Sequence, residues 1–196
     1  MSDPRLEVWL SELLTTPGLT SIGERDEAWA MLVEDALRGV DVVRELPGSI
    51  VDVGSGGGSP GIPLAAAFSD REVTLLEANG RKAQFLERVA AGFPNVTVVR
   101  GRAEDQETDA FGVAVAKALA VPPVALEWML PLVRVGGAAV LWLGPSADLQ
   151  QLGRAAEQLG GGPPEQRAGL TVVPKVEVTP AGFPRRPGVA RKRPLA

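Results

Sequence analysis

Apolar residues recur along this chain with a period that changes near residue 48. In residues 3–15 they return every three or four positions, which predicts a short amphipathic helix that ends before Pro17-Gly18. A second helix is predicted from about residue 24 to residue 46, where another proline and glycine follow. After residue 48 short apolar runs are bounded by turn-forming residues, as expected for buried strands.

The second part of the chain alternates predicted strands with stretches of helical length. Strands are predicted in residues 49–53, 72–77, 95–100, 112–116 and 138–143, helices in residues 60–68, 81–91, 121–133 and 146–159, and a closing hairpin in residues 170–173 and 176–178. This alternation predicts an α/β fold with a doubly wound, mostly parallel, seven-stranded sheet. Ligands of such sheets lie beyond the carboxyl ends of the strands, so we seek the functional residues there.

A glycine-rich loop follows the first predicted strand. It reads Asp52-Val53-Gly54-Ser55-Gly56-Gly57-Gly58-Ser59-Pro60-Gly61. Five glycines in the last eight residues are more than a tight turn requires, so the backbone is expected to approach a ligand closely; a simple strand-to-helix turn is the alternative. Candidate binding residues are Asp52, Gly54, Gly56, Gly58 and Ser59.

Two features of this loop favour one class of cofactor over another. A dinucleotide favours the pattern Gly-x-Gly-x-x-Gly, but Ser59 stands in the third glycine position. Asp52 lies two residues before the first glycine, where its carboxylate would oppose a pyrophosphate. S-adenosylmethionine carries an ammonium and a sulfonium group and no phosphate, so the pattern favours this methyl donor.

Further candidates follow the second and third predicted strands. Glu77 ends the second strand, where its carboxylate can accept hydrogen bonds from both hydroxyls of a ribose. Ala103 and Glu104 follow the third strand, and an acid or a backbone carbonyl there can meet an adenine amino group. The alternatives are a solvated acid at Glu77 and an ordinary polar loop at residues 101–105.

Composition narrows the possible chemistry. The chain has 196 residues, 45% of them hydrophobic, which suits one α/β domain. It has no cysteine and no histidine, which excludes a thiol nucleophile and a histidine base, and we expect no metal. It has no apolar run of membrane-spanning length and no signal-peptide pattern at its start, so we expect a cytoplasmic protein without membrane contact.

Charge is distributed unevenly along the chain. The formal net charge is −4, from 20 basic and 24 acidic side chains. Residues 185–193 nevertheless hold five cations and no acid: Arg185, Arg186, Arg191, Lys192 and Arg193. Such a cluster can neutralise nucleic-acid phosphates, although a solvated chain end is the alternative.

Several of these motifs together resemble one known family. They are the glycine loop with the Pro60-Gly61-Ile62-Pro63 that ends it, Gly101-Arg102-Ala103-Glu104, Leu126-Glu127-Trp128, and Phe183-Pro184-Arg185-Arg186-Pro187-Gly188. They resemble the small-subunit ribosomal RNA methyltransferase G family, also called glucose-inhibited division protein B. The resemblance covers about residues 10–194.

The resemblance implies a fold, an activity and a set of site residues. The fold would be the Rossmann-like class I fold of S-adenosylmethionine-dependent methyltransferases, and the reaction would be methylation of guanine N7 in 16S ribosomal RNA. The donor pocket would be lined by Gly54, Ser59, Ala103, Glu104 and Lys117. Lys117 is also a candidate for positioning the substrate, together with Arg185 and Arg186.

The chain departs from the family pattern at five positions. Lys117 stands where the family usually has arginine, Ser59 replaces a bulky apolar residue, and Leu143 replaces lysine. Met31-Leu32 stands in place of an Arg-His pair. Two alternatives therefore stay open: a small-molecule methyltransferase on the same fold, and a non-catalytic member that binds RNA or the methyl donor.

Guanine N7 methylation is compatible with the missing side chains. The N7 atom carries a lone pair and no proton, so no base is needed and the catalyst mainly has to align the reacting atoms. Pyrimidine C5 methylation by the usual route needs a cysteine nucleophile and is excluded. The partner is expected to be ribosomal RNA or the small ribosomal subunit.

The pattern also predicts three parts of the chain. Residues 1–47 form a helical extension, residues 48–180 form the methyltransferase domain, and residues 181–196 form a basic tail on or near that domain. We expect the protein to be a monomer.

Overall fold

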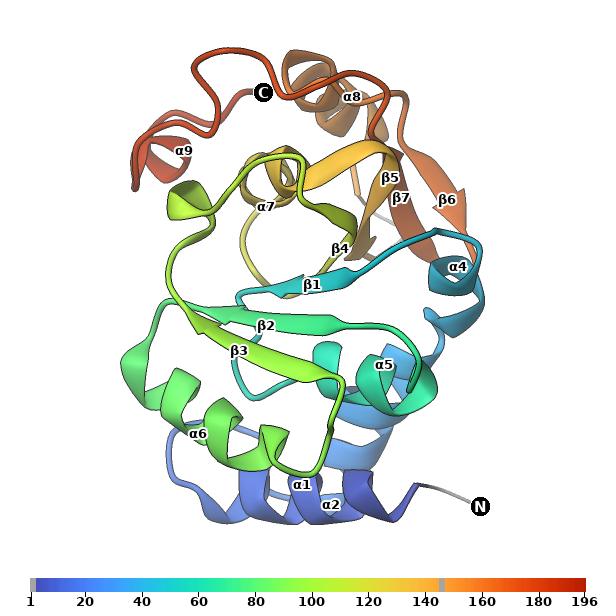
Figure 1. Ribbon diagram of the computed structural model, residues 1–196, viewed down its shortest axis with the longest axis vertical. Coiled ribbons are helices and arrows are strands. Elements are labelled where there is room, and N and C mark those ends of the chain that lie inside the picture. The colour runs from blue at the N-terminus through green and yellow to red at the C-terminus, as the bar shows by residue number, and fades with distance from the viewer. Residues whose placement is uncertain (1–2, 145–146) are drawn as a thin grey trace.

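The sheet lies at the centre of the computed structural model, which describes residues 3–144 and 147–196 (Figure 1). Its strands are β1 (Ile50–Val53), β2 (Val73–Glu77), β3 (Val96–Arg100), β4 (Phe111–Lys117), β5 (Val133–Trp142), β6 (Glu165–Arg167) and β7 (Leu170–Pro174). Their order is β3-β2-β1-β4-β5-β7-β6, with β1 to β5 parallel and β7 antiparallel to both of its neighbours, β5 and β6. The predicted doubly wound, mostly parallel sheet of seven strands is confirmed.

Helices cover both faces of this sheet (Figure 1). One face carries α1 (Pro4–Thr15), α5 (Gly61–Ala67) and α6 (Gly80–Ala90), and the other carries α7 (Pro122–Met129) and α8 (Leu149–Gln158). Short elements complete the chain: the 3-10 helices η2 (Ala103–Asp105) and η3 (Leu130–Leu132), and α9 (Val189–Lys192). Residue 146, the predicted start of the α8 helix, lies outside the described residues. No helix within the described residues is long and apolar enough to cross a membrane.

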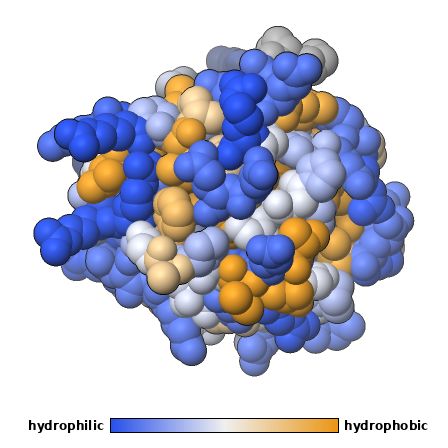
Figure 2. All heavy atoms as spheres, turned by 90° about the horizontal axis from the view of Figure 1, so that it is seen from above, coloured by the Kyte–Doolittle hydropathy of each residue, from blue (hydrophilic) through white to orange (hydrophobic). Residues whose placement is uncertain are grey.

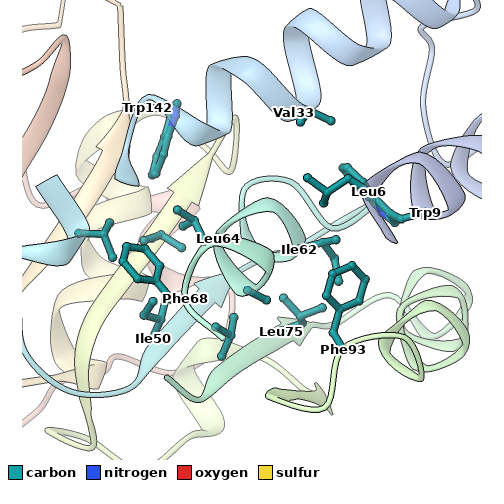
Figure 3. Packing of buried hydrophobic residues seen from close by; sticks show 14 of the residues in the cluster. Leu6, Trp9, Val33, Ile50, Ile62, Leu64, Phe68, Leu75, Phe93 and Trp142 are labelled. Atoms are coloured by element: carbon teal, nitrogen blue, oxygen red, sulfur yellow. The ribbon is translucent and has the colours of Figure 1, made fainter. Parts of the chain in front are cut away.

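Alternation along β1 divides the core into two clusters. Ile50 belongs to the cluster that includes side chains of α1, α5 and α6, whereas Val51 and Val53 belong to the cluster that includes side chains of α7 and α8. Figure 3 shows the first cluster, with side chains of α5 at its centre and Trp9 of α1 at its edge. Because α1 shares this core with the sheet, the boundary proposed at residue 47 is not a break in packing; the three-part division stays a prediction.

The prediction of one continuous helix over residues 24–46 is wrong, because the segment is helical but is divided into shorter helices of different geometry. It consists of α2 (Arg25–Ala28), the π-helix η1 (Trp29–Glu34), α3 (Asp35–Leu37) and α4 (Val40–Arg44). Four carbonyl oxygens here accept side-chain hydrogen bonds from elsewhere: that of Met31 from Lys117, that of Leu32 from Ser59, that of Asp35 from Trp142 and that of Val43 from Arg71. Local periodicity cannot reveal donors that lie far away in the sequence.

The predicted hairpin is also wrong in its second strand. β7 pairs with β6, and the turn between them has positive φ angles at Ala168 (50°) and Gly169 (76°), as a tight two-residue hairpin requires. The segment 176–178 is not a strand, because Lys175 next to it is fully buried and anchors the chain. Its ammonium donates to the carbonyls of Leu130 and Leu159 and to Thr179 Oγ1.

Candidate functional site

A pocket of about 260 Å³ opens at the carboxyl ends of β1, β2 and β4. This is where a doubly wound sheet places its ligand. Four of the predicted binding residues line it: Gly54, Glu77, Ala103 and Glu104. Residues after β4 and single residues from α6, α7 and α9 complete the walls.

Glu77 organises the glycine loop from the end of β2. The residue is 8% exposed; Oε2 accepts a hydrogen bond from the Gly56 N–H at 2.8 Å, and Oε1 accepts one from the Asn79 N–H at 2.7 Å. A carboxylate has about four lone-pair positions, so each oxygen keeps capacity for one more donor. Glu77 therefore shapes the loop and can still accept hydrogen bonds from ribose hydroxyls.

Asp52 lies beneath the loop and not in the pocket wall. Its side chain is 1% exposed, and Oδ2 accepts a hydrogen bond from the Gly61 N–H at 3.0 Å. It occupies the face of β1 opposite Val53, which does line the pocket. Burial raises the pKa of Asp52 from 3.8 to about 7; hydrogen bonds from Gly61 and Ser55 oppose that rise, and the charge of Glu77 adds to it. Asp52 thus holds the start of α5 in place.

The glycines of the loop serve different neighbours. Gly54 has a φ of +71°, and a Cβ there would lie 2.3 Å from Leu119 in the pocket wall. Gly58 instead faces α1, since a Cβ there would lie 3.0 Å from Trp9 Nε1. That indole nitrogen donates to the Gly57 carbonyl at 2.8 Å. Gly54 therefore leaves room for Leu119 in the pocket wall, whereas Gly57 and Gly58 permit close packing of α1.

Most of the positions that were expected to depart from the family pattern meet at one junction beside the pocket. Ser59 Oγ donates to the Leu32 carbonyl at 2.8 Å, and Lys117 donates to the Met31 carbonyl while pairing with Asp35. These contacts join the glycine loop and the end of β4 to the π-helix. The structure thus turns Ser59 and Lys117 toward this junction. Leu143 and Lys117 both line a neighbouring groove of about 410 Å³.

The basic tail has a defined place on the molecule. Arg185 forms a two-pronged ion pair with Glu127 of α7, whose side chain is 2% exposed, whereas Arg186 is exposed to solvent. Figure 2 looks onto the end of the molecule that carries α8 and α9, and hydrophilic side chains project from its left side, where Figure 1 places α9. The cations of residues 185–193 therefore differ in what they contact.

The sequence did not single out every residue of the pocket. Lys82, Leu119, Trp128 and Arg191 line it as well. Trp128 belonged to a motif but carried no chemical signal of its own, and Arg191 was only one cation among five. Arg191 lies over the Trp128 ring, with its Cζ atom 5.1 Å from the ring centroid. Only the folded chain brings this pair to the pocket.

Two buried polar atoms of the pocket-lining residues lack partners. Glu104 Oε1 and Trp128 Nε1 have no hydrogen-bond partner in the described part of the chain. Buried polar atoms are normally paired, so an acceptor and a donor of this kind indicate a ligand with both functions. An adenine offers an amino group and ring nitrogens. The pocket residues therefore fit an adenosine-containing cofactor.

The fold and the site together define the class of protein. The chain is similar in structure to a predicted O-methyltransferase from Agrobacterium tumefaciens (TM-score 0.57, 19% identity, 71% of this chain and 78% of that one). It is also similar to a TehB-like SAM-dependent methyltransferase from Corynebacterium glutamicum (TM-score 0.53, 19% identity, 76% and 91%). The fold is the Rossmann-like class I methyltransferase fold.

Sequence comparison then identifies the family. The family model described as "GidB: rRNA small subunit methyltransferase G" matches residues 6–159. A "Ribosomal RNA small subunit methyltransferase G" from Moorella thermoacetica is 35% identical over 90% of this chain and 82% of its own length. One from Syntrophomonas wolfei is 37% identical over 77% and 79%. The chain belongs to the ribosomal RNA small subunit methyltransferase G family, which confirms the resemblance read from its motifs.

Proposed function

We propose that this protein is a cytoplasmic S-adenosylmethionine-dependent methyltransferase that methylates N7 of a guanine in 16S ribosomal RNA. The observation that carries the donor assignment is the pocket beyond β1, β2 and β4. It brings together Gly54, the Glu77 carboxylate and the unpaired Glu104 Oε1. Membership of the family supports the substrate.

Each pocket residue has a separate part in holding the donor. Glu77 accepts hydrogen bonds from the ribose hydroxyls with the lone pairs that Gly56 and Asn79 leave available. Glu104 Oε1 accepts a hydrogen bond from the adenine amino group. Gly54 lines the pocket with its backbone, and its missing side chain leaves room for Leu119 in the pocket wall. When bound, S-adenosylmethionine supplies an electrophilic methyl group on its sulfonium.

The substrate side requires positioning and no base. Guanine N7 presents a lone pair, and nothing has to be deprotonated before it is methylated. A chain without histidine and cysteine can align the guanine N7 with the methyl group and the sulfur of the donor by shape and hydrogen bonds alone. Lys117 stays a candidate for this positioning, provided that its ammonium leaves Asp35 when RNA binds.

We expect that Glu77→Gln weakens binding of S-adenosylmethionine roughly 100-fold. The amide has the same shape, but its NH₂ group must face the N–H of Gly56 or of Asn79, and its remaining oxygen is a weaker acceptor. Isothermal calorimetry on both proteins measures the change. Wild-type protein is titrated with NAD in parallel, and no binding is expected.

The matched control is Glu72→Gln, which changes an exposed carboxylate just before β2, away from the pocket. It should leave donor affinity within twofold of wild type. If Glu77→Gln binds as well as this control, Glu77 is not a ribose ligand. If wild type binds NAD and does not respond to S-adenosylmethionine, the proposed function is wrong.

We expect the exposed Arg186 to contact RNA phosphates. Arg185 is not expected to do so, because it is paired with Glu127. Arg186→Ala should weaken binding to 16S ribosomal RNA and lower the salt slope of the affinity by about 1, because one phosphate contact is lost. Filter binding at a series of salt concentrations gives that slope. Arg134→Ala, an exposed change at the amino end of β5, is the control. Equal slopes for the two variants would make Arg186 a solvated side chain.

The substrate itself is tested in cells that lack the protein. Mass spectrometry of their 16S ribosomal RNA should show one N7-methylguanosine missing, and the wild-type gene should restore it. Intact methylation would exclude the proposed substrate. It would favour a small-molecule methyltransferase or a non-catalytic member of the family. The non-catalytic alternative agrees with the ion pair between Lys117 and Asp35, which occupies the candidate positioning residue at the end of β4.

A further inference from the structure

The C-terminal helix α9 (Val189–Lys192) reaches the donor pocket through Arg191. Arg191, on α9, is exposed to solvent, lines the pocket and places its Cζ atom 5.1 Å from the centre of the Trp128 ring. Trp128 comes from α7 and is 8% exposed. Arg191, a basic residue of the tail, therefore forms part of the pocket wall.

Several contacts keep α9 in this position. Ala190, next to Arg191, is buried in the cluster beneath α7 and α8. Arg185 donates from Nη2 to the Arg193 carbonyl at 2.8 Å while pairing with Glu127, and Gln158 of α8 donates to the Leu195 carbonyl at 3.1 Å. The chain before and after Arg191 is thus tied to α7 and α8. This placement differs from that of a solvated chain end.

We propose that Arg191 is a donor-binding residue that, with Trp128, forms the adenine side of the pocket. This inference rests on the proposed function. An arginine guanidinium is planar and stacks on aromatic faces, so on the Trp128 ring it can present a flat surface and N–H donors to a purine. Trp128 Nε1, which lacks a partner in the described part of the chain, supplies a further donor for a ring nitrogen.

The charge of Arg191 gives the proposal a sharp test. S-adenosylmethionine carries one more positive charge than S-adenosylhomocysteine, and that charge is on the sulfonium, away from the adenine. If the guanidinium contacts the neutral adenine, its loss weakens both ligands equally, and adenosine alone as well. If it acted only through long-range charge, its loss would favour the methyl donor over the product.

The experiment compares the affinities of three ligands for Arg191→Ala and wild type by calorimetry. Adenosine, S-adenosylhomocysteine and S-adenosylmethionine are each expected to bind about tenfold more weakly to the variant. Trp128→Phe keeps an aromatic ring, although a smaller one, and removes the indole N–H, and it should weaken binding of the three ligands by a common factor as well. Lys192→Ala, the neighbouring exposed cation on α9, is the matched control and should stay within twofold of wild type.

Thermal unfolding of each variant separates binding from folding, and Arg191→Ala should melt like the control because its side chain is exposed. The inference is overturned if Arg191→Ala binds adenosine as Lys192→Ala does, or if the losses for donor and product differ by more than threefold. If wild type binds none of the three ligands, the proposed function fails and this inference fails with it. Wild-type binding with an unchanged Arg191→Ala affinity rejects the inference alone.

Discussion

Replacing Arg185 with alanine is expected to lower the free energy of unfolding by about 3–5 kcal/mol. The guanidinium makes a two-pronged contact with Glu127, whose side chain is 2% exposed, and its loss leaves a buried carboxylate without a partner. Uncompensated buried charge is much more costly than the loss of an exposed ion pair. Urea unfolding monitored by circular dichroism measures the difference.

The neighbouring Arg186 is the natural control, because it is exposed and adjacent in sequence. Arg186→Ala should change the unfolding free energy by about 0.5 kcal/mol or less. The double change Glu127→Met with Arg185→Met should recover most of the loss, since an apolar pair of similar size avoids the desolvation of two charges. An Arg185→Ala variant as stable as Arg186→Ala would show that the pair does not hold the tail.

Asp52 is expected to make the protein less stable as the pH rises from about 4 to about 7. Burial raises its pKa in the folded chain to about 7 from an ordinary value of 3.8, so between these values the folded state binds more protons than the unfolded state. The contribution of Asp52 protonation to the free energy of unfolding is fully present below pH 4, and it is lost once the pH exceeds 7. A shift of about 3 pKa units corresponds to about 4 kcal/mol.

Asp52→Asn isolates this contribution. The asparagine oxygen can still accept the Gly61 N–H, but the side chain cannot ionise. The variant should match wild type near pH 4 and exceed its unfolding free energy by up to about 4 kcal/mol at pH 8. Asp26→Asn, at an exposed acid of α2, should not show this trend. A difference between Asp52→Asn and wild type that does not vary with pH would contradict the prediction.

The contrast between Arg185 and Asp52 shows where inference from a motif stops. Both residues were candidates for contact with a ligand, because a charged side chain next to a glycine loop or in a basic cluster is typical of such contacts. In the folded chain each is paired with another part of the protein: Arg185 with Glu127, and Asp52 with the Gly61 amide. A sequence shows that a charge is present, but not whether the fold already uses it.

The same limit applies to Lys117 and Ser59. Their side chains bind carbonyl oxygens of Met31 and Leu32. Those carbonyls belong to the π-helix η1. Most positions that were expected to depart from the family pattern are therefore neighbours in space, although they are far apart in the sequence.

The sequence by itself determined the class of fold and the end of the sheet where the site lies. Buried parallel strands require continuous apolar runs, crossovers require amphipathic helices, and close approach of a ligand requires glycine, so each leaves a local pattern. Glu77, which lines the pocket, was a candidate for the same reason, because it ends a strand next to that loop.

Tertiary structure alone decided which polar groups remain available for a ligand and which segments complete the pocket. Hydrogen bonds and ion pairs between distant residues leave no period in the sequence, and so Arg191 on Trp128, the buried Lys175 and the pairing of β6 with β7 emerged only from the folded chain. The physical reason is that local patterns record burial and backbone geometry, whereas the partner of a charge is set by packing between elements far apart in the chain.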